Sequence, residues 1–423
     1  MTVPRGNIVF NSLTGSDTQA SGLGPVNAVY GAGASTTAGS SVVTGINTSG
    51  VTVGDLLWVM SSSGNQFSII ASVDSSTQVT CDDNFDNTES GITWAIGGKR
   101  ATFDNVNSRN LFSTFSNKYA VVETETDQSL SSQIHRPAGF GGFRLKGNDK
   151  TVSCEGNHGA FVASQNSSFV FCNFKFMGSA GNTATACTGG YIRCEYCVFG
   201  EKGSSNNFQS AVKNGAYASS GYLFRCKLYG QGNTVGYGLW GSYYAAGTGQ
   251  LVECSISDFQ YGVYLINNAG HTYNTVIRSI FSNCQGGVYS NANLISPQSC
   301  IFHDIVGDAI YLMGTNIHTS RLLDPAAPFA DNIFINVGGY LMRWGGYGLP
   351  LDTYMPNLTT QYENYYVWYQ YNSPAGNLNL DFPTRTLSVQ PFLDPSSGDF
   401  NFSKALYNSW NEPGYATYDF GNV

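Results

Sequence analysis

The sequence has few charged residues and no excess of positive charge. Only 11% of its 423 residues are Asp, Glu, Lys or Arg, about half the share that is usual in a globular protein. Lys and Arg number 20 against 28 Asp and Glu, which gives a formal net charge of −8. Binding to nucleic acid or to an anionic membrane needs clustered cations, so we expect neither partner.

Long apolar runs are missing as well. No stretch approaches the roughly 18 consecutive apolar residues of a membrane span, so we expect no membrane insertion. The opening residues, MTVPRGNIVFNSL, lack a basic segment followed by an apolar one, so we expect no secretory signal peptide. Hydrophobic residues make up 42% of the chain and aromatic residues 14%, which is enough for a packed core.

The ten cysteines do not have the spacing of a zinc site. Cys194 and Cys197 form one CxxC pair, but no second pair stands at the right distance and the five histidines do not complete one. A chain of this length builds its own core, so it does not need a disulfide framework. We therefore expect reduced, buried thiols that pack as small hydrophobic groups, and no metal or cofactor.

Helical periodicity is nearly absent, whereas short runs of Val, Ile, Phe, Tyr and Cys between Gly, Asn and Ser predict strands throughout. One pattern repeats in the middle of the chain: a small residue, then any residue, then an apolar one. The first and third residues of such a segment share a face of a strand. The small residues are Cys172, Cys194 (with Cys197 as an alternative), Cys226, Cys254, Ser279, Cys300 and Asn332.

A second set of segments follows the first along the chain. These segments are Gly238-Leu239-Trp240, Gly262-Val263-Tyr264, Gly287-Val288-Tyr289, Ala309-Ile310-Tyr311 and Gly339-Tyr340-Leu341. Two sets of strands that advance together predict a solenoid of β-coils, with one small residue of each coil stacked along its axis. A β-sandwich would not need a column of aligned cysteines.

On these motifs, residues from about 140 to 345 resemble a right-handed parallel β-helix of the pectate-lyase-like superfamily. The expected fold is therefore all-β: a right-handed parallel β-helix preceded by a small β-barrel-like module. We expect the module in residues 1–100 and the β-helix in residues 101–345. Residues 346–423 form an aromatic-rich C-terminal β region that completes or caps the helix.

The first hundred residues have a pattern of their own. Strands are predicted over residues 53–59, 67–73, 76–80 and 91–98, after a strand-compatible stretch that begins at Gly31. A Gly-Asp pair before a strand and the pattern I-x-S-V-x-S-x-T resemble a small β module of phage tail-fibre and baseplate-associated proteins. The D-P-x-x-G-D-F pattern at residues 394–400 is similar to a segment that often closes right-handed β-helix proteins.

These resemblances imply a structural virion protein of a tailed bacteriophage, either a tail spike or fibre or a fibre or decoration of the head. They also imply a homotrimer, made in the host cytoplasm and located in the virion. Its partners would be other virion proteins, reached through residues 1–100, and a host surface glycan. The module either docks to the particle or only caps the first coil. The alternatives are a host-polysaccharide hydrolase or lyase on the same fold, and a cellular carbohydrate-binding β-helix.

Carboxylates would be the catalytic groups if the chain were an enzyme. Glycoside hydrolysis uses two carboxylates roughly 5 to 9.5 Å apart, and Asp304 and Asp308 lie around one predicted turn, with Asp258 in the matching turn of an earlier coil. Each of them is also an ordinary turn residue that hydrogen-bonds nearby backbone. The Asn-Thr-Asp and Gly-His-Gly motifs of the superfamily's hydrolases are missing, so we expect no catalytic site.

Aromatic residues are the candidates for carbohydrate binding. They follow the second set of strands in glycine-rich segments, and they are Trp240, Tyr243, Tyr244, Trp344 and Tyr347. Aromatic surfaces with few charges suit sugar rings, which present apolar CH faces and hydroxyl groups. The same residues would also suit an interface between subunits, or simple packing over exposed coil edges.

Overall fold

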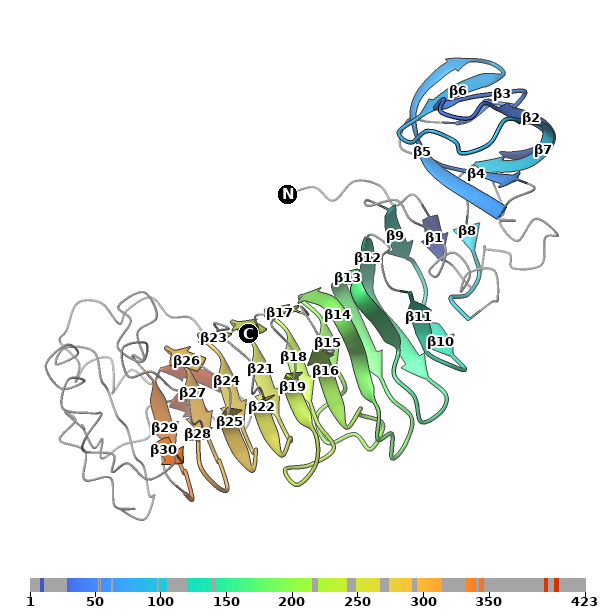
Figure 1. The fold of residues 1–423 in the computed structure, drawn as a ribbon. Helices are drawn as coiled ribbons and strands as arrows, with labels where there is room; N and C mark the ends of the chain where they lie inside the picture. Colours follow the sequence, from blue (N-terminus) through green and yellow to red (C-terminus); the bar gives the residue numbers. More distant parts are fainter. Residues whose placement is uncertain are drawn as a thin grey trace, which may run out of the picture. The chain divides into compact units, whose positions relative to one another are not determined.

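The computed structural model is all-β and contains a parallel β-solenoid of about six turns, with a small antiparallel sheet near the N-terminus (Figure 1). It describes residues 8–10, 29–51, 53, 55–61, 64–96, 99–104, 120–137, 142–214, 220–241, 249–266, 274–290, 295–313, 332–339, 342–345, 392–394 and 399–402. No helix capable of crossing a membrane occurs among these residues. The chain divides into two compact units, residues 1–179 with 187–193, and residues 180–186 with 194–423.

Six antiparallel strands close into a small barrel in the first unit. In barrel order they are β2 (Val29–Thr36), β3 (Val42–Thr44), β6 (Gln78–Cys81), β5 (Gly64–Ser75), β4 (Leu56–Ser61) and β7 (Glu89–Ile96). Alternation along the strands turns side chains such as Leu57, Val59 and Trp94 into a common apolar core. The four predicted strands are confirmed with shifted ends, and the strand-compatible stretch from Gly31 supplies two more. The domain boundary at residue 100 stays a prediction.

The first unit also contains parallel strands of the solenoid. They are β1 (Ile8–Phe10), β8 (Lys99–Arg100), β9 (Ala120–Thr124), β10 (Gln128–Leu130), β11 (Ile134–Arg136), β12 (Gly142–Cys154) and β13 (Phe161–Met177). Phenylalanines fill their interior, and the rings of Phe161 and Phe171 lie 4.8 Å apart. Arg136 is fully buried among them with its guanidinium 4.5 Å from the centre of the Phe143 ring. Burial lowers the pKa of Arg136 to about 10.

The second unit contains three parallel sheets, one strand of each per coil, after β14 (Thr185–Glu195), whose residues belong to both units. The first sheet contains β17 (Ser220–Phe224), β20 (Gly249–Val252), β23 (Asn274–Ile277) and β26 (Ile295–Gln298). The second sheet contains β15 (Val198–Phe199), β18 (Lys227–Tyr229), β21 (Ser255–Ser257), β24 (Ile280–Ser282), β27 (Ile301–His303) and β29 (Ile333–Ile335).

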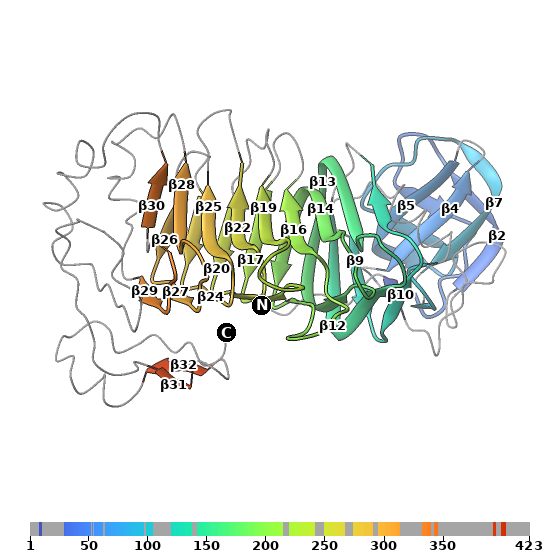
Figure 2. The same cartoon turned by 90° about the horizontal axis from the view of Figure 1, so that it is seen from below.

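The third sheet follows the second along each coil, and its strands lie side by side in Figure 2. They are β16 (Ser210–Asn214), β19 (Tyr237–Gly241), β22 (Tyr261–Leu265), β25 (Gly286–Ser290), β28 (Ile310–Met313) and β30 (Met342–Gly345). Near the C-terminus, β31 (Phe392–Asp394) and β32 (Asp399–Phe402) form an antiparallel pair that overlaps the two ends of the D-P-x-x-G-D-F pattern.

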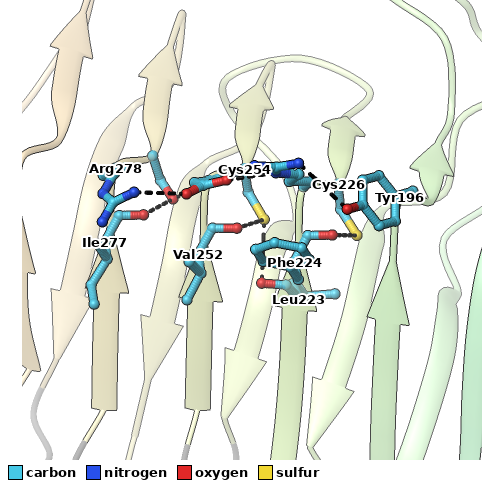
Figure 3. A network of polar contacts seen from close by, with 11 residues as sticks. Tyr196, Leu223, Phe224, Cys226, Val252, Cys254, Ile277 and Arg278 are labelled. Atoms are coloured by element: carbon cyan, nitrogen blue, oxygen red, sulfur yellow. Dashed lines mark hydrogen bonds and ion pairs between the residues drawn. The ribbon is translucent and has the colours of Figure 1, made fainter. Parts of the chain in front are cut away.

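A single left-handed residue makes the corner between the first and second sheets. Arg225 and Glu253 have φ angles of 50° and 54° at this corner, and each is followed by a buried cysteine. The Cys226 thiol donates to the carbonyl of Phe224 at 3.4 Å, and the next coil repeats this bond from Cys254 to Val252 at 3.3 Å (Figure 3). The position after the left-handed residue therefore needs a side chain that is both small and a hydrogen-bond donor.

Strand pairing gives the register of this column. The residue pairs of the second sheet align Cys197, Cys226, Cys254, Ser279, Cys300 and Asn332. The predicted column is confirmed from residue 226 onward, and Cys197 takes the place predicted for Cys194. The prediction for Cys172 was wrong: Cys172 is half-buried, and Asn173 is the left-handed residue with a φ of 55°. Cys172 therefore precedes its corner, and buried Phe174 follows it.

Phenylalanine and glycine fit together inside the later coils. The rings of Phe281, Phe302 and Phe334 stack along the second sheet at 4.9 and 5.1 Å. They face glycines of the third sheet, and a methyl carbon added to Gly287 would lie 2.5 Å from the Phe302 ring. A side chain at this position would displace the ring, so the backbone of the third sheet forms the opposite wall of the core.

The burial of the thiols makes a prediction for chemical labelling. Nine of the ten free cysteines are buried and Cys172 is half-buried. Burial raises the pKa of Cys284 and of Cys300 to about 12, and the thiolate is the reactive form. We expect an alkylating reagent at neutral pH to modify Cys172 first in the native chain, as measured by mass spectrometry.

The Cys172→Ser variant is the control, because it should remain unlabelled until urea unfolds the chain. Rapid native labelling of Cys226 or Cys254 would show that the inner column described above is wrong.

Candidate ligand-binding face

Six aromatic side chains form a continuous group on the outer face of the third sheet. We call this group the tyrosine stack, and its members are Tyr237, Trp240, Tyr261, Tyr264, Tyr289 and Tyr311. In β19, Gly238 and Leu239 are buried, and the aromatic residues on either side of them, Tyr237 and Trp240, are half-buried. β22 repeats this pattern, so both strands present two rings outward.

Strand register arranges these rings in two rows. Trp240, Tyr264, Tyr289 and Tyr311 are direct register partners in successive strands. Tyr237 and Tyr261 form a second row beside them, which ends where Gly286 pairs with Tyr261. A methyl carbon at Gly286 would lie 2.5 Å from the Tyr261 ring, so the ring occupies the space that a side chain there would need.

The two rows interleave, so the rings stack on one another. Tyr237 lies 4.3 Å from Tyr264 with an angle of 11° between the ring planes, and Tyr264 lies 4.8 Å from Tyr289 at 22°. Tyr261 lies 5.4 Å from Tyr264 and 5.3 Å from Tyr289. Tyr311 ends the stack and is turned by 84° relative to Tyr289. Stacking therefore uses ring faces, and the rings of β19 and β22 are half-buried on the outer side of the sheet.

A cation lies at the other end of the stack. The Lys213 ammonium is 3.6 Å from the centre of the Trp240 ring, and the two residues are register partners in β16 and β19. Burial lowers the pKa of Lys213, while the electron-rich indole face favours its charged form. This contact covers one face of Trp240, so a sugar ring could stack there only by displacing the ammonium.

Four phenol groups of the stack have a raised pKa. Burial is the main cause that raises the pKa of Tyr237, Tyr261, Tyr264 and Tyr289, and Asp308 adds to the effect at Tyr261. A phenol is neutral at pH 7 even with its ordinary pKa of about 10, so each of these groups can both donate and accept a hydrogen bond. The stack offers a ligand neutral hydrogen-bonding groups in a row.

The stack contains one of the five predicted carbohydrate-binding residues, Trp240. Trp344 lies in β30 as the register partner of Leu312, whereas Arg343 is the partner of Tyr311. Tyr243, Tyr244 and Tyr347 lie outside the described residues. The predicted alignment at residues 339–341 was wrong by two positions, because Ile310 pairs with Met342.

The sequence contained a signal for the other rings. An aromatic residue ends three of the predicted Gly-x-aromatic segments, at positions 240, 264 and 289, and Tyr311 ends the matching segment without glycine. We interpreted these segments only as coil strands and missed their outward row.

Two of the three candidate catalytic carboxylates belong to a structural corner. Asp258 and Asp304 follow strands of the second sheet with φ angles of 64° and 52°, a region that Asp and Asn tolerate better than most residues. Asn283 donates to Asp258 at 2.5 Å, and Asn336 donates to Asp304 at 2.9 Å. These bonds join one coil to the next and match the interpretation of both residues as turn residues.

The remaining carboxylate has different surroundings. Asp308 is half-buried just before β28, and its carboxylate is close enough to Tyr261 to raise the pKa of the Tyr261 phenol. Asp304 instead lies beside the second sheet, where its carboxylate is 3.0 Å from Nδ1 of buried His303. Burial lowers the pKa of His303 although Asp304 favours its protonation.

Comparison with known proteins returns no assignment: no protein-family model matches the chain and no curated protein is similar to it. Within the described part of the chain, no three His, Cys, Asp or Glu side chains gather as a metal site would require.

The contact between Lys213 and Trp240 makes a prediction for stability. Lys213→Met removes the charge and keeps most of the length of the side chain, so it should remove a cation–π contribution of about 1 kcal/mol. We expect a double-mutant cycle with Trp240→Leu, measured by urea unfolding, to give a coupling of that size.

Lys227 provides the matched control, because it is exposed on the second sheet. Lys227→Met should combine additively with Trp240→Leu. Equal coupling for the two lysines would contradict a specific contact at Lys213.

Proposed function

We propose that the chain is a structural virion protein of a tailed bacteriophage that presents a glycan-facing surface. It would be a tail spike or fibre, or a fibre or decoration of the head. The observation that carries the proposal is the tyrosine stack, six rings across four successive strands on the outside of a solenoid. The proposal includes a right-handed β-helix of the pectate-lyase-like superfamily as the type of solenoid.

The stack suits an extended glycan for a geometric reason. Parallel strands repeat every ~4.8 Å, and the register partners Tyr264, Tyr289 and Tyr311 provide one phenol on each successive coil. Tyr237, Tyr264 and Tyr289 are already held by ring stacking, which lowers the entropy that binding would have to remove. A glycan that runs along this row can exchange hydrogen bonds with the neutral phenols and lay its apolar CH groups against their edges.

The arrangement of the chain supports a role in a particle. The chain combines a small closed barrel near the N-terminus with a solenoid of parallel coils, an arrangement that suits attachment by one part and display by the other. In the proposal, residues 1–100 attach the protein to other virion proteins, and the coils carry the exposed surface. Three copies would assemble into a homotrimer, and host lysis would release the particle without a need for secretion.

The alternative of a polysaccharide hydrolase or lyase has less support. Asp258 and Asp304 occupy left-handed corners and accept hydrogen bonds from asparagines of the next coils. Their carboxylates therefore already have a structural use. Depolymerisation of a host polysaccharide that Asp304→Asn or Asp308→Asn abolished would favour this alternative.

The location in the virion is tested on purified particles of the phage that encodes the chain. Peptides from all parts of the chain should remain at constant stoichiometry to the other virion proteins through a density gradient, as measured by quantitative mass spectrometry. A host cytoplasmic protein serves as the contamination control. If the chain washes away with that control, it is not a virion component.

Glycan binding is tested with the host's surface polysaccharide and calorimetry. Tyr264→Ala removes the central ring of the stack, and we expect about tenfold weaker binding, or about 1.4 kcal/mol. Tyr222→Ala is the matched control, because Tyr222 is also half-buried but lies on the first sheet. Equal losses for the two variants, with unchanged thermal unfolding, would rule out the stack as the binding surface.

A further inference from the structure

The tyrosine stack brings phenol rings from different coils into face-to-face contact. Tyr264 is the central member, with Tyr237 on one side at 4.3 Å and 11° and Tyr289 on the other at 4.8 Å and 22°. These three residues belong to β19, β22 and β25, so each contact joins one coil to the next.

We propose that Tyr264 is a site of oxidative modification, where a dityrosine bond joins it to Tyr237 or to Tyr289. The co-reactant is a one-electron oxidant, such as hydrogen peroxide with a haem peroxidase. Each of the two phenols loses one electron and one proton to give a phenoxyl radical. The radicals couple through their ortho carbons, and tautomerisation restores both phenols. One peroxide accepts the two electrons and two protons and becomes two waters, so the reaction balances.

The geometry favours coupling at these pairs over coupling elsewhere. Two phenoxyl rings combine when their faces overlap, and an angle of 11° between Tyr237 and Tyr264 provides that overlap before oxidation. Strand register holds the backbones together, because Tyr264 pairs directly with Tyr289. Tyr264 and Tyr289 are half-buried and not fully enclosed, so an oxidant can reach them and remove an electron.

The product would be a covalent staple between neighbouring coils. A cross-link limits the conformations that an unfolded chain can adopt, so it raises the resistance of these coils to unfolding. This inference does not depend on the proposed function, since it concerns the chemistry of the stack and holds whichever ligand the face binds.

The test uses the full chain at low concentration, treated with hydrogen peroxide and a haem peroxidase. We expect dityrosine fluorescence in the single-chain band of a denaturing gel, with a cross-linked peptide that contains Tyr264 and a mass loss equal to two hydrogens. Treated protein should also unfold at a higher temperature than untreated protein.

Two variants separate stacking from simple exposure. Tyr264→Phe keeps the ring but lacks the phenol, so most of the intrachain product should be lost while the thermal unfolding of untreated protein stays the same. Tyr196→Phe removes a more exposed phenol, 45% accessible, whose ring packs edge-on against Phe224, and it should leave the yield unchanged. Cross-links that form mainly at Tyr196, only between molecules, or equally well in Tyr264→Phe would overturn the proposal.

Discussion

The solenoid depends on one corner, in which a left-handed residue is followed by a small hydrogen-bond donor. The left-handed residue turns the chain from the first sheet to the second, and its backbone N–H binds the next coil, as from Arg225 to Val252 at 3.0 Å. The Val252 carbonyl also accepts a hydrogen bond from the Cys254 thiol. The backbone of one coil and a side chain of the next therefore both donate to this one oxygen. A larger side chain at Cys254 would have to enter a fully packed interior. The same corner places Arg225, Glu253 and Arg278 outside, where Glu253 pairs with both arginines at 2.6 and 2.9 Å. Because both arginine side chains are about half exposed to solvent, these ion pairs contribute little to stability, and the inner column does more to keep the coils in register.

Register at the corner determines what faces outward on the third sheet. Because the Phe281 and Phe302 rings fill the interior, the facing strands carry glycine at positions 262 and 287. Those strands can then pack closely against the core, and their half-buried positions are free for large rings. Tyr264 and Tyr289 are each two residues from one of these glycines and are register partners of each other. The outer stack is therefore a consequence of the inner packing: each ring stacks on its neighbour because the corners hold the coils one strand spacing apart.

Sequence patterns predicted the solenoid and most of its inner column, because the corner tolerates so few residue types. They failed at Cys172, where the letters alone do not show whether a cysteine stands before or after the left-handed residue. The barrel was predicted with four of its six strands, since glycine-rich strands such as Val29–Thr36 carry weak apolar alternation. The candidate binding face was found only at Trp240. Strict alternation puts residues 237 and 239 on one face, whereas Gly238 and Leu239 are both buried and the flanking rings both point outward. Two adjacent buried residues cannot be derived from a period of two, and this departure from alternation produces the second row of rings.

The inner column at the corners and the outer tyrosine stack are separate, and this affects how a ligand could bind to the stack. A ligand that needs ring faces would have to break contacts such as that between Tyr237 and Tyr264, whose planes differ by only 11°. A ligand that uses ring edges and hydroxyl groups meets the stack as it stands and leaves the corners undisturbed. The intact stack therefore favours an extended, hydroxyl-rich molecule that lies along the coils over a single sugar ring held in a pocket. The two ends of the stack differ from its middle, with the Lys213 ammonium over Trp240 at one end and the turned ring of Tyr311 at the other. Because the two ends differ in this way, the row has a direction, and a polymer with distinguishable ends would bind it in one orientation.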